Sequence, residues 1–205
     1  MRVIVVGAGV VGLTTAVCLR EAGVAADVVA REPPEGTTSA VAAALWYPYR
    51  ALPVERVTAW SAATYAELER LAGVTGSGVR MRAGLERLAA DAPDPWWRAA
   101  VGDLRRTSTG LRFTAPVVDM SVHLRWLVER LRALGGALET RAVRALDGVE
   151  ADAVVNCAGL GARELAGDGT LTAVRGQVVR VAAPAVTEWF LDQSDPERLV
   201  YVVPR

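Results

Sequence analysis

The sequence contains no lysine, so each of its 23 basic residues is an arginine. Because 23 acidic residues balance them, the formal net charge at pH 7 is zero. A chain without excess charge creates no field that would draw it to nucleic acid or to an anionic membrane surface. We therefore expect neither nucleic acid nor a membrane among its partners.

Cysteine and histidine are also scarce. The two cysteines, Cys18 and Cys157, lie in apolar stretches and have no metal-ligand spacing. We interpret them as buried free thiols of a reducing compartment. The single histidine, His123, lies on a predicted helix face, where a structural role is the simpler interpretation. The sequence offers no Ser/His/Asp set, carboxylate pair or metal cluster.

Long apolar runs are missing as well. No stretch approaches the ~18 continuous apolar residues of a membrane span. The N-terminal MRVIVVGAG is too short for the apolar core of a signal peptide and lacks a cleavage site. These absences predict a cytoplasmic protein.

A strand–helix–strand unit opens the chain. Val3–Val6 is a β-branched run typical of a strand buried on both faces of a parallel sheet. Val10–Ala22 is apolar along one side and ends before Gly23, which predicts a helix, and Ala26–Ala30 predicts a second strand. This order is a βαβ unit.

A glycine fingerprint joins the first strand to the helix, in the order Gly7-Ala8-Gly9-Val10-Val11-Gly12. In such a G-x-G-x-x-G turn, Gly7 allows the tight turn and Gly9 lets the backbone approach a pyrophosphate. Gly12 lets the helix pack closely on the sheet. The unpaired N–H groups at the positive end of the helix dipole then bind the phosphates. Its position after a strand and before a helix makes this fingerprint specific for a dinucleotide.

The residues after the second strand leave the choice of dinucleotide open. Glu32 lies 20 residues after Gly12, where the fingerprint requires an acid for the ribose hydroxyls. Arg31 precedes it and would suit the 2′-phosphate of NADP. The residue chemistry alone is compatible with FAD, NAD and NADP, and with a Glu32 that is only a solvated carboxylate.

Further elements follow along the chain. Val54–Leu71 and Val122–Leu134 are predicted helices, the second capped by Ser121. The predicted strands are Ala137–Leu146, Ala153–Cys157, Gln177–Val181 and Leu199–Val203. We expect an α/β protein (α+β overall), with a Rossmann-like domain and an interleaved second domain on a mixed or antiparallel sheet. The expected ranges are 1–50 with 136–175, and 51–135 with 176–205.

One segment resembles the D-amino-acid oxidase family, which carries T-T-x-x-V-A-A-G-L-W-x-P-Y. It is Thr37-Thr38-Ser39-Ala40-Val41-Ala42-Ala43-Ala44-Leu45-Trp46-Tyr47-Pro48-Tyr49. By resemblance, Thr37, Thr38 and Ser39 hold the FAD pyrophosphate, while Ala44 and Leu45 present backbone to the flavin. Two departures are Ala44, where the family often has glycine, and the order Arg31-Glu32, where mammalian members have Asp-Arg.

The resemblance continues to the end of the sequence. It includes the helix His123–Leu131, the strand segment Asp152–Gly159, Arg175-Gly176-Gln177, Asp195-Pro196-Glu197-Arg198 and Tyr201-Val202-Val203-Pro204. Val143, Cys157 and Ala158 match family positions near FAD. Tyr201 matches a tyrosine whose hydroxyl reaches the substrate carboxylate, whereas the family's second lid tyrosine has no match.

The resemblance implies FAD as cofactor and oxidation of a D-amino acid by hydride transfer from Cα to flavin N5. The products would be a 2-oxo acid, ammonia and, with dioxygen, hydrogen peroxide, and the enzyme could form a homodimer. Three alternatives stay open: a flavin oxidase of the glycine or sarcosine type, an NADP-dependent dehydrogenase, and a non-catalytic FAD-binding fragment.

The family's substrate-anchoring arginine and its C-terminal glycine-rich segment have no match here. The apolar strand Leu199–Val203 is also expected to lack a hairpin partner. We therefore expect the sequence to be the N-terminal part of a longer oxidase. Otherwise Arg50 or Arg175 would be the first candidates for the carboxylate anchor.

Overall fold

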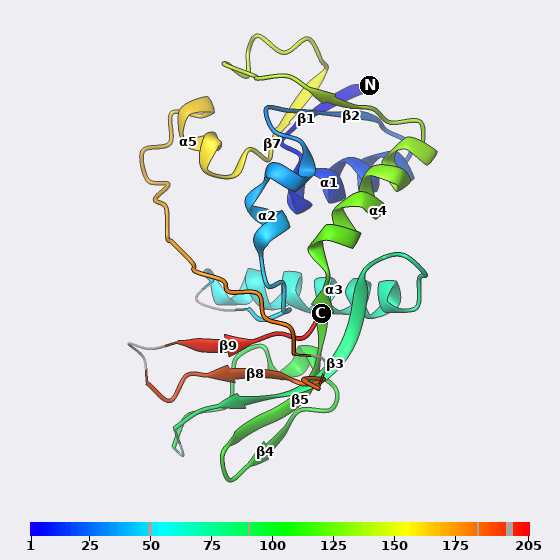
Figure 1. Ribbon diagram of the computed structural model, residues 1–205. Coiled ribbons are helices and arrows are strands. Elements are labelled where there is room, and N and C mark those ends of the chain that lie inside the picture. The colour runs from blue at the N-terminus through cyan, green and yellow to red at the C-terminus, as the bar shows by residue number, and fades with distance from the viewer. Residues whose placement is uncertain (49–50, 90, 184, 196–198) are drawn as a thin grey trace. The chain divides into compact units, whose positions relative to one another are not determined.

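The computed structural model describes residues 1–48, 51–89, 91–183, 185–195 and 199–205 (Figure 1). The chain divides into two compact units, each assembled from two separate stretches. Unit 1 comprises Met1–Ala42 and Met120–Val179, and unit 2 comprises Ala43–Asp119 and Arg180–Arg205. The two units alternate along the sequence, and the second stretch of unit 1 begins at Met120, before the residue 136 of the predicted domain.

Unit 1 contains a four-stranded, fully parallel sheet in the order β6-β2-β1-β7. Its strands are β1 (Arg2–Val6), β2 (Ala25–Ala30), β6 (Leu138–Thr140) and β7 (Ala153–Asn156). The apolar run Val3–Val6 is buried throughout, because β1 is an inner strand of a parallel sheet. Helix α1 (Val10–Glu21) connects β1 to β2, so the predicted βαβ unit is confirmed.

Helix α4 (Met120–Ala133) belongs to unit 1, which corrects the sequence prediction that 51–135 lies in the second domain. The reason is its buried face, since α4 packs against α1. The buried side chains of α4 are Met120, His123, Leu124, Leu127, Val128 and Leu131. Because the helix begins at Met120, Ser121 lies inside the first turn and is not the cap that we predicted.

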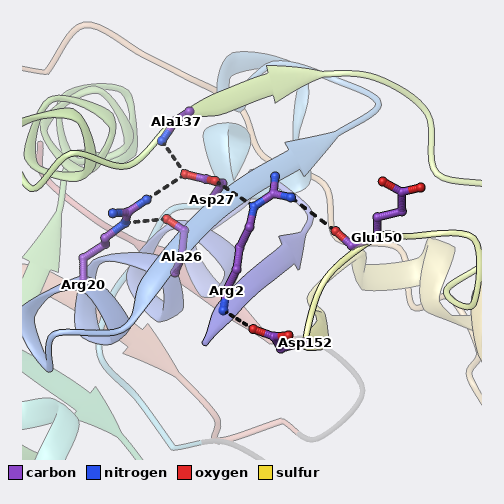
Figure 2. Close-up of polar contacts among 7 residues, drawn as sticks. All are labelled: Arg2, Arg20, Ala26, Asp27, Ala137, Glu150 and Asp152. Carbon is purple, nitrogen blue, oxygen red and sulfur yellow. Dashed lines mark hydrogen bonds and ion pairs between the residues drawn. The ribbon is translucent and has the colours of Figure 1, made fainter.

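The amino ends of β1 and β2 are joined by an ionic cluster around Asp27 (Figure 2). Asp27 Oδ1 accepts hydrogen bonds from Arg20 of α1 at 2.8 Å and from the N–H of Ala137 at 3.0 Å. Arg2 of β1 lies 3.7 Å from the other carboxylate oxygen. The backbone N–H of Arg2 in turn donates to Asp152, just before β7. One half-buried carboxylate thus connects α1, β1, β2 and the segment leading to β6.

Unit 2 contains a mixed five-stranded sheet in the order β4-β5-β3-β8-β9. Its strands are β3 (Val79–Arg87), β4 (Arg105–Thr107), β5 (Gly110–Val118), β8 (Trp189–Asp192) and β9 (Val200–Val202). Only the β3–β8 pair is parallel. Helix α3 (Val54–Ala72) packs on this sheet. Its bounds agree with the predicted helix Val54–Leu71. An aromatic core fills the unit: Trp46, Tyr65, Trp97, Phe113 and Trp189.

The remaining helical elements are short. They are η1 (Pro34–Gly36), α2 (Thr38–Val41), η2 (Arg98–Ala100), η3 (Gly159–Gly161) and α5 (Ala162–Leu165). Among the helices of the described ranges, none is long and apolar enough to cross a membrane.

Three strand predictions were wrong in whole or in part. Gln177–Val181 forms no strand and is exposed. The predicted strand Ala137–Leu146 is reduced to β6, because the chain leaves the sheet after Thr140. The predicted strand Leu199–Val203 does have a partner: β8 precedes it in the chain and pairs with β9 in antiparallel register, with Leu191 opposite Tyr201.

Candidate functional site

The glycine loop lies at the carboxyl edge of the parallel sheet of unit 1. The N–H of Gly7 donates to the carbonyl of Val29 at 2.9 Å, and the N–H of Cys157 donates to that of Val6 at 2.8 Å. The loop after β1 is therefore held between the ends of β2 and β7. Ligands of open α/β sheets bind in the crevice at this edge.

The three glycines of the loop serve different purposes. Gly7 has φ +119°, and a Cβ there would lie 2.3 Å from the carbonyl oxygen of Cys157. A Cβ on Gly12 would lie 1.9 Å from the carbonyl oxygen of Gly7. The backbone itself therefore excludes a side chain at both positions. A Cβ on Gly9 would meet only the Ser39 hydroxyl, at 3.0 Å. The fold does not require glycine at position 9, so this glycine leaves space for a ligand.

The start of α1 faces the segment that the sequence assigned to phosphate. The N–H of Val10 donates to Ser39 Oγ at 3.0 Å, which brings the glycine loop and α2 together. The first turn of α1 holds no acidic residue. The initial N–H groups of a helix lack partners within it and lie at its positive end. Ala8 is buried and Val11 is exposed. The N–H groups at the start of α1 and the backbone of Gly9, which has no side chain, together form a cradle that fits a diphosphate.

The neighbouring threonines differ in what their hydroxyl groups contact. Thr37 Oγ1 donates to the carbonyl of Pro34 at 2.6 Å and so stabilises the turn of η1. Thr38 is exposed at the start of α2. A phosphate could be bound by Thr38 directly, whereas Thr37 must first give up its local hydrogen bond.

Arg31 and Glu32 follow β2 at the same edge of the sheet. Both are exposed, and their side chains pair with each other at 3.3 Å. An ion pair between exposed side chains contributes little to stability. The Glu32 carboxylate therefore stays available to accept hydrogen bonds from ribose hydroxyls.

Val143 and Ala158 pack against one apolar cluster, formed by Ile4, Val6 and Val29 of β1 and β2. The turn after β7 depends on Asn156, whose Oδ1 accepts the N–H of Ala158 at 3.2 Å. Sequence reasoning missed this residue, although a lone asparagine between an apolar strand and small residues is a typical turn signal. Burial raises the pKa of the nearby Cys157 thiol, against the opposing effect of its hydrogen bond with Thr15. Cys157 is therefore a neutral, partly buried thiol. Cys18 is exposed, so the prediction that both cysteines are buried was wrong.

Ala44, Leu45 and Tyr201 lie in unit 2. Ala44 adopts φ +53°, the one positive value at a non-glycine residue in the described ranges. Its carbonyl accepts the N–H of Val118 at 2.9 Å, and Leu45 forms a bridge with Val117. The left-handed backbone explains why a glycine would suit position 44. Tyr201 is 39% exposed on β9, so its hydroxyl can reach a ligand.

A buried polar cluster in unit 2 was not predicted. Glu86 on β3 is 2% exposed, and its Oε1 accepts hydrogen bonds from the Tyr47 hydroxyl and, at 2.7 Å, from Gln193 Nε2. Within the described residues, Glu86 Oε2 has no hydrogen-bond partner. Burial raises the pKa of this carboxyl group, and the bonds from Tyr47 and Gln193 oppose the rise only partly.

A surface hollow of about 230 Å³ also lies in unit 2, and none of the predicted site residues lines it. Three of its charged lining residues already have polar partners. Arg112 pairs with Glu188 at 2.6 Å, and Asp103 accepts hydrogen bonds from the N–H and hydroxyl of Thr114. In the described part of the chain, no cluster of three His, Cys, Asp or Glu side chains could hold a metal ion.

Some of the predicted motifs cannot be placed. Tyr49, Arg50 and the Pro196-Glu197-Arg198 portion of the D-P-E-R motif lie outside the described residues. Arg175 is exposed in the segment between α5 and β8.

Comparison with known proteins identifies the family. Residues 2–205 match the family model described as FAD dependent oxidoreductase (DAO). The chain is 50% identical over 216 residues to a D-amino-acid oxidase of Rubrobacter xylanophilus, covering 100% of this chain and 66% of that protein. It is 45% identical over 213 residues to a D-amino-acid oxidase of Streptomyces coelicolor, covering 100% of this chain and 67% of that one.

A solved structure shows the same fold. Glycine oxidase from Geobacillus kaustophilus superimposes with a TM-score of 0.65 at 14% identity, over 99% of this chain and 68% of that one. The chain thus spans about two thirds of the length of the curated relatives it matches. The family match decides the open choice of dinucleotide in favour of FAD over NAD and NADP. On these findings, the chain belongs to the D-amino-acid oxidase family of FAD-dependent oxidoreductases.

Proposed function

We propose that this chain is the FAD-binding portion of an oxidase that deaminates D-amino acids. The carrying observation is the cradle at Gly9, where a Cβ would meet no backbone atom and only the Ser39 side chain, beside the start of α1. In this proposal the loop 7–12, with Thr37, Thr38 and Ser39, binds the pyrophosphate. Glu32 binds the adenosine ribose, with Arg31 exposed beside it.

The flavin and the substrate are assigned to the other predicted residues. Ala44 and Leu45 offer backbone to the flavin, and Val143, Cys157 and Ala158 line the cofactor site near the carboxyl edge of the sheet of unit 1. Tyr201 donates its hydroxyl to the substrate carboxylate, which its exposure on β9 allows.

The proposed reaction converts a D-amino acid, dioxygen and water into a 2-oxo acid, ammonia and hydrogen peroxide. Bound FAD supplies the acceptor for the hydride that leaves the substrate Cα. The chain contributes binding and orientation. The start of α1 holds the negative charge of the cofactor, and Tyr201 fixes the carboxylate end of the substrate so that Cα is presented in one orientation.

A glycine- or sarcosine-type oxidase is the second candidate, because the fold also superimposes on that of a glycine oxidase. A third is an FAD-binding portion without turnover of its own, because the chain spans about two thirds of its relatives. As part of the same proposal we place the protein in the cytoplasm, supported by its two free cysteines. A homodimer is proposed from the family resemblance alone, and light scattering tests it.

An absorption spectrum of the purified chain with FAD, recorded without oxygen, tests the proposal. We expect flavin absorption. Bleaching by D-alanine or D-valine, but not by glycine or sarcosine, would support the deamination of D-amino acids. Bleaching by glycine or sarcosine alone would favour the second candidate. Bound but unbleached flavin would favour the third, and no bound flavin would contradict the cradle itself.

A further inference from the structure

Glu86 joins two segments of unit 2 that are distant in the sequence. Its Oε1 accepts hydrogen bonds from the Tyr47 hydroxyl and Gln193 Nε2, across sequence separations of 39 and 107 residues. Gln193 also donates to the Tyr47 hydroxyl, so the three side chains form a closed set. At 2% exposure, Glu86 has lost its water, and these bonds replace it at Oε1, whereas Oε2 has no hydrogen-bond partner among the described residues.

Tyr47 and Gln193, the two partners of Glu86, each belong to or adjoin a segment that carries a residue of the proposed site. Tyr47 follows Leu45 by two positions, and its ring packs edge-on against Trp97 at 5.5 Å. Gln193 extends β8, since its N–H donates to the carbonyl of Arg87 at 3.0 Å. The segment that carries Ala44 and Leu45 is thus bonded to the strand beside β9.

Strand register places Glu86 and Tyr201 on one face of the sheet. Glu86 pairs with Leu191 of β8, and Leu191 pairs with Tyr201 of β9. Residues directly opposite each other in a sheet point to the same face. Gln193 shares this face because it lies two residues after Leu191. Glu86, Leu191 and Tyr201 therefore form one row, and Gln193 lies diagonal to Tyr201.

We propose that Glu86 is a positioning residue that holds the Tyr47 segment and the β8–β9 hairpin in the arrangement the flavin and substrate require. This inference rests on the proposed function. In the proposed function Glu86 contacts neither the flavin nor the substrate, and its carboxyl group acts through Tyr47 and Gln193. An uncharged Glu86 carboxyl group can accept the hydrogen bonds of both Tyr47 and Gln193, which agrees with its burial.

Comparing ADP with FAD separates positioning from general stability. ADP reports on the cradle of unit 1, whereas FAD also reports on the residues assigned to the flavin. We expect Glu86→Leu and Tyr47→Phe to weaken FAD binding by roughly tenfold, the value of one or two hydrogen bonds, with ADP binding unchanged. Glu86→Gln retains a neutral acceptor and should bind FAD as the unaltered chain does. Glu188→Leu removes an exposed carboxylate near the same sheet and serves as the matched control.

The outcomes are distinct. Equal losses of ADP and FAD affinity in both Glu86→Leu and Tyr47→Phe would show a general effect on folding and overturn the inference. Unchanged FAD affinity in these variants would overturn it too, as would a Glu86→Gln variant as weak as Glu86→Leu. If Glu86→Leu fails to fold, Tyr47→Phe decides, because it removes a single hydroxyl. An unaltered chain that binds no FAD contradicts the proposed function and this inference with it.

Discussion

At the residue scale, different glycines of the loop 7–12 serve ligand binding and folding. Gly9→Val should abolish FAD binding and leave a folded protein, because its side chain enters the cradle and meets only Ser39. Gly12→Val should instead destabilise the fold, because its Cβ would overlap the Gly7 carbonyl. Flavin absorption after gel filtration and circular dichroism measure the two effects. Full retention of flavin by Gly9→Val would contradict the cradle.

Glu32 is predicted to contribute binding energy for the cofactor alone. Its side chain is exposed, and among the described residues its ion pair is with the exposed Arg31, so the fold does not depend on it. Glu32→Ala should weaken FAD binding by roughly 1.5–3 kcal/mol, the usual contribution of a hydrogen bond to a charged group. Titration calorimetry measures this, with Glu35→Ala in the adjacent η1 as the control. Equal affinities would leave Glu32 a solvated carboxylate.

Glu86 should make the stability of the protein depend on pH. Burial raises its pKa in the folded state, so between the unfolded and folded pKa values the folded chain binds the additional proton. Stability from this group is complete below the unfolded pKa and is lost as the pH rises through the folded one. Glu86→Gln has no proton to lose. Urea unfolding from about pH 4 to about pH 8 should show the unaltered chain losing stability relative to Glu86→Gln. Parallel curves would contradict a raised pKa.

The local fingerprint at residues 7–12 predicted the turn between β1 and α1, and the structure shows why positions 7 and 12 must be glycine. The binding of a pyrophosphate by this loop stays a prediction. Sequence analysis missed the set of Tyr47, Glu86 and Gln193, because hydrogen bonds across 39 and 107 residues leave no local pattern. Ala44 was noted as a departure from glycine, but only the structure gives its positive φ.

At the scale of the elements, Asp27 connects the amino ends of the sheet in unit 1. Asp27→Ala would leave the Arg20 guanidinium and the Ala137 N–H without their shared acceptor (Figure 2). We expect a loss of about 1–3 kcal/mol in the free energy of unfolding. Urea denaturation measures it. Glu139→Ala, which breaks an exposed pair with Arg141, is the control and should change little. Equal effects of the two substitutions would contradict the role of Asp27.

The elements that the sequence predicted well are those with a strong local pattern. The continuous apolar run Val3–Val6, the helix α1 that follows the glycine fingerprint and the amphipathic helix α3 are of this kind. Strands β3 and β5 were not predicted, although apolar residues recur at every second position of β5, as in a half-buried strand. The segment Gln177–Val181 has the apolar character of a strand but no partner in the described residues, and a strand needs one to satisfy its backbone.

At the scale of the whole molecule, the chain passes between its two units three times, and the last passage is exposed. Residues 172–183 form neither helix nor strand and lie on the surface. Since the chain has no lysine, trypsin can cut only at arginine. We predict that limited trypsin digestion cuts first at Arg175 and Arg180, because an exposed segment outside the helices and strands fits a protease. Mass spectrometry identifies the cut. Earlier cleavage within α3 or α4 would contradict this exposure.

The pairing of β1 with β7 limits when unit 1 can complete its folding during synthesis on the ribosome. Val3 is opposite Ala153, so the parallel sheet of unit 1 cannot be completed until about 150 residues have been translated. The antiparallel β3–β5 pair of unit 2 emerges before that point and requires no residue after Val118. Domains generally fold as units while synthesis proceeds, and local pairings form before distant ones. The nascent chain therefore carries β1 and α1 through the synthesis of about 150 residues before β7, which completes their sheet, appears.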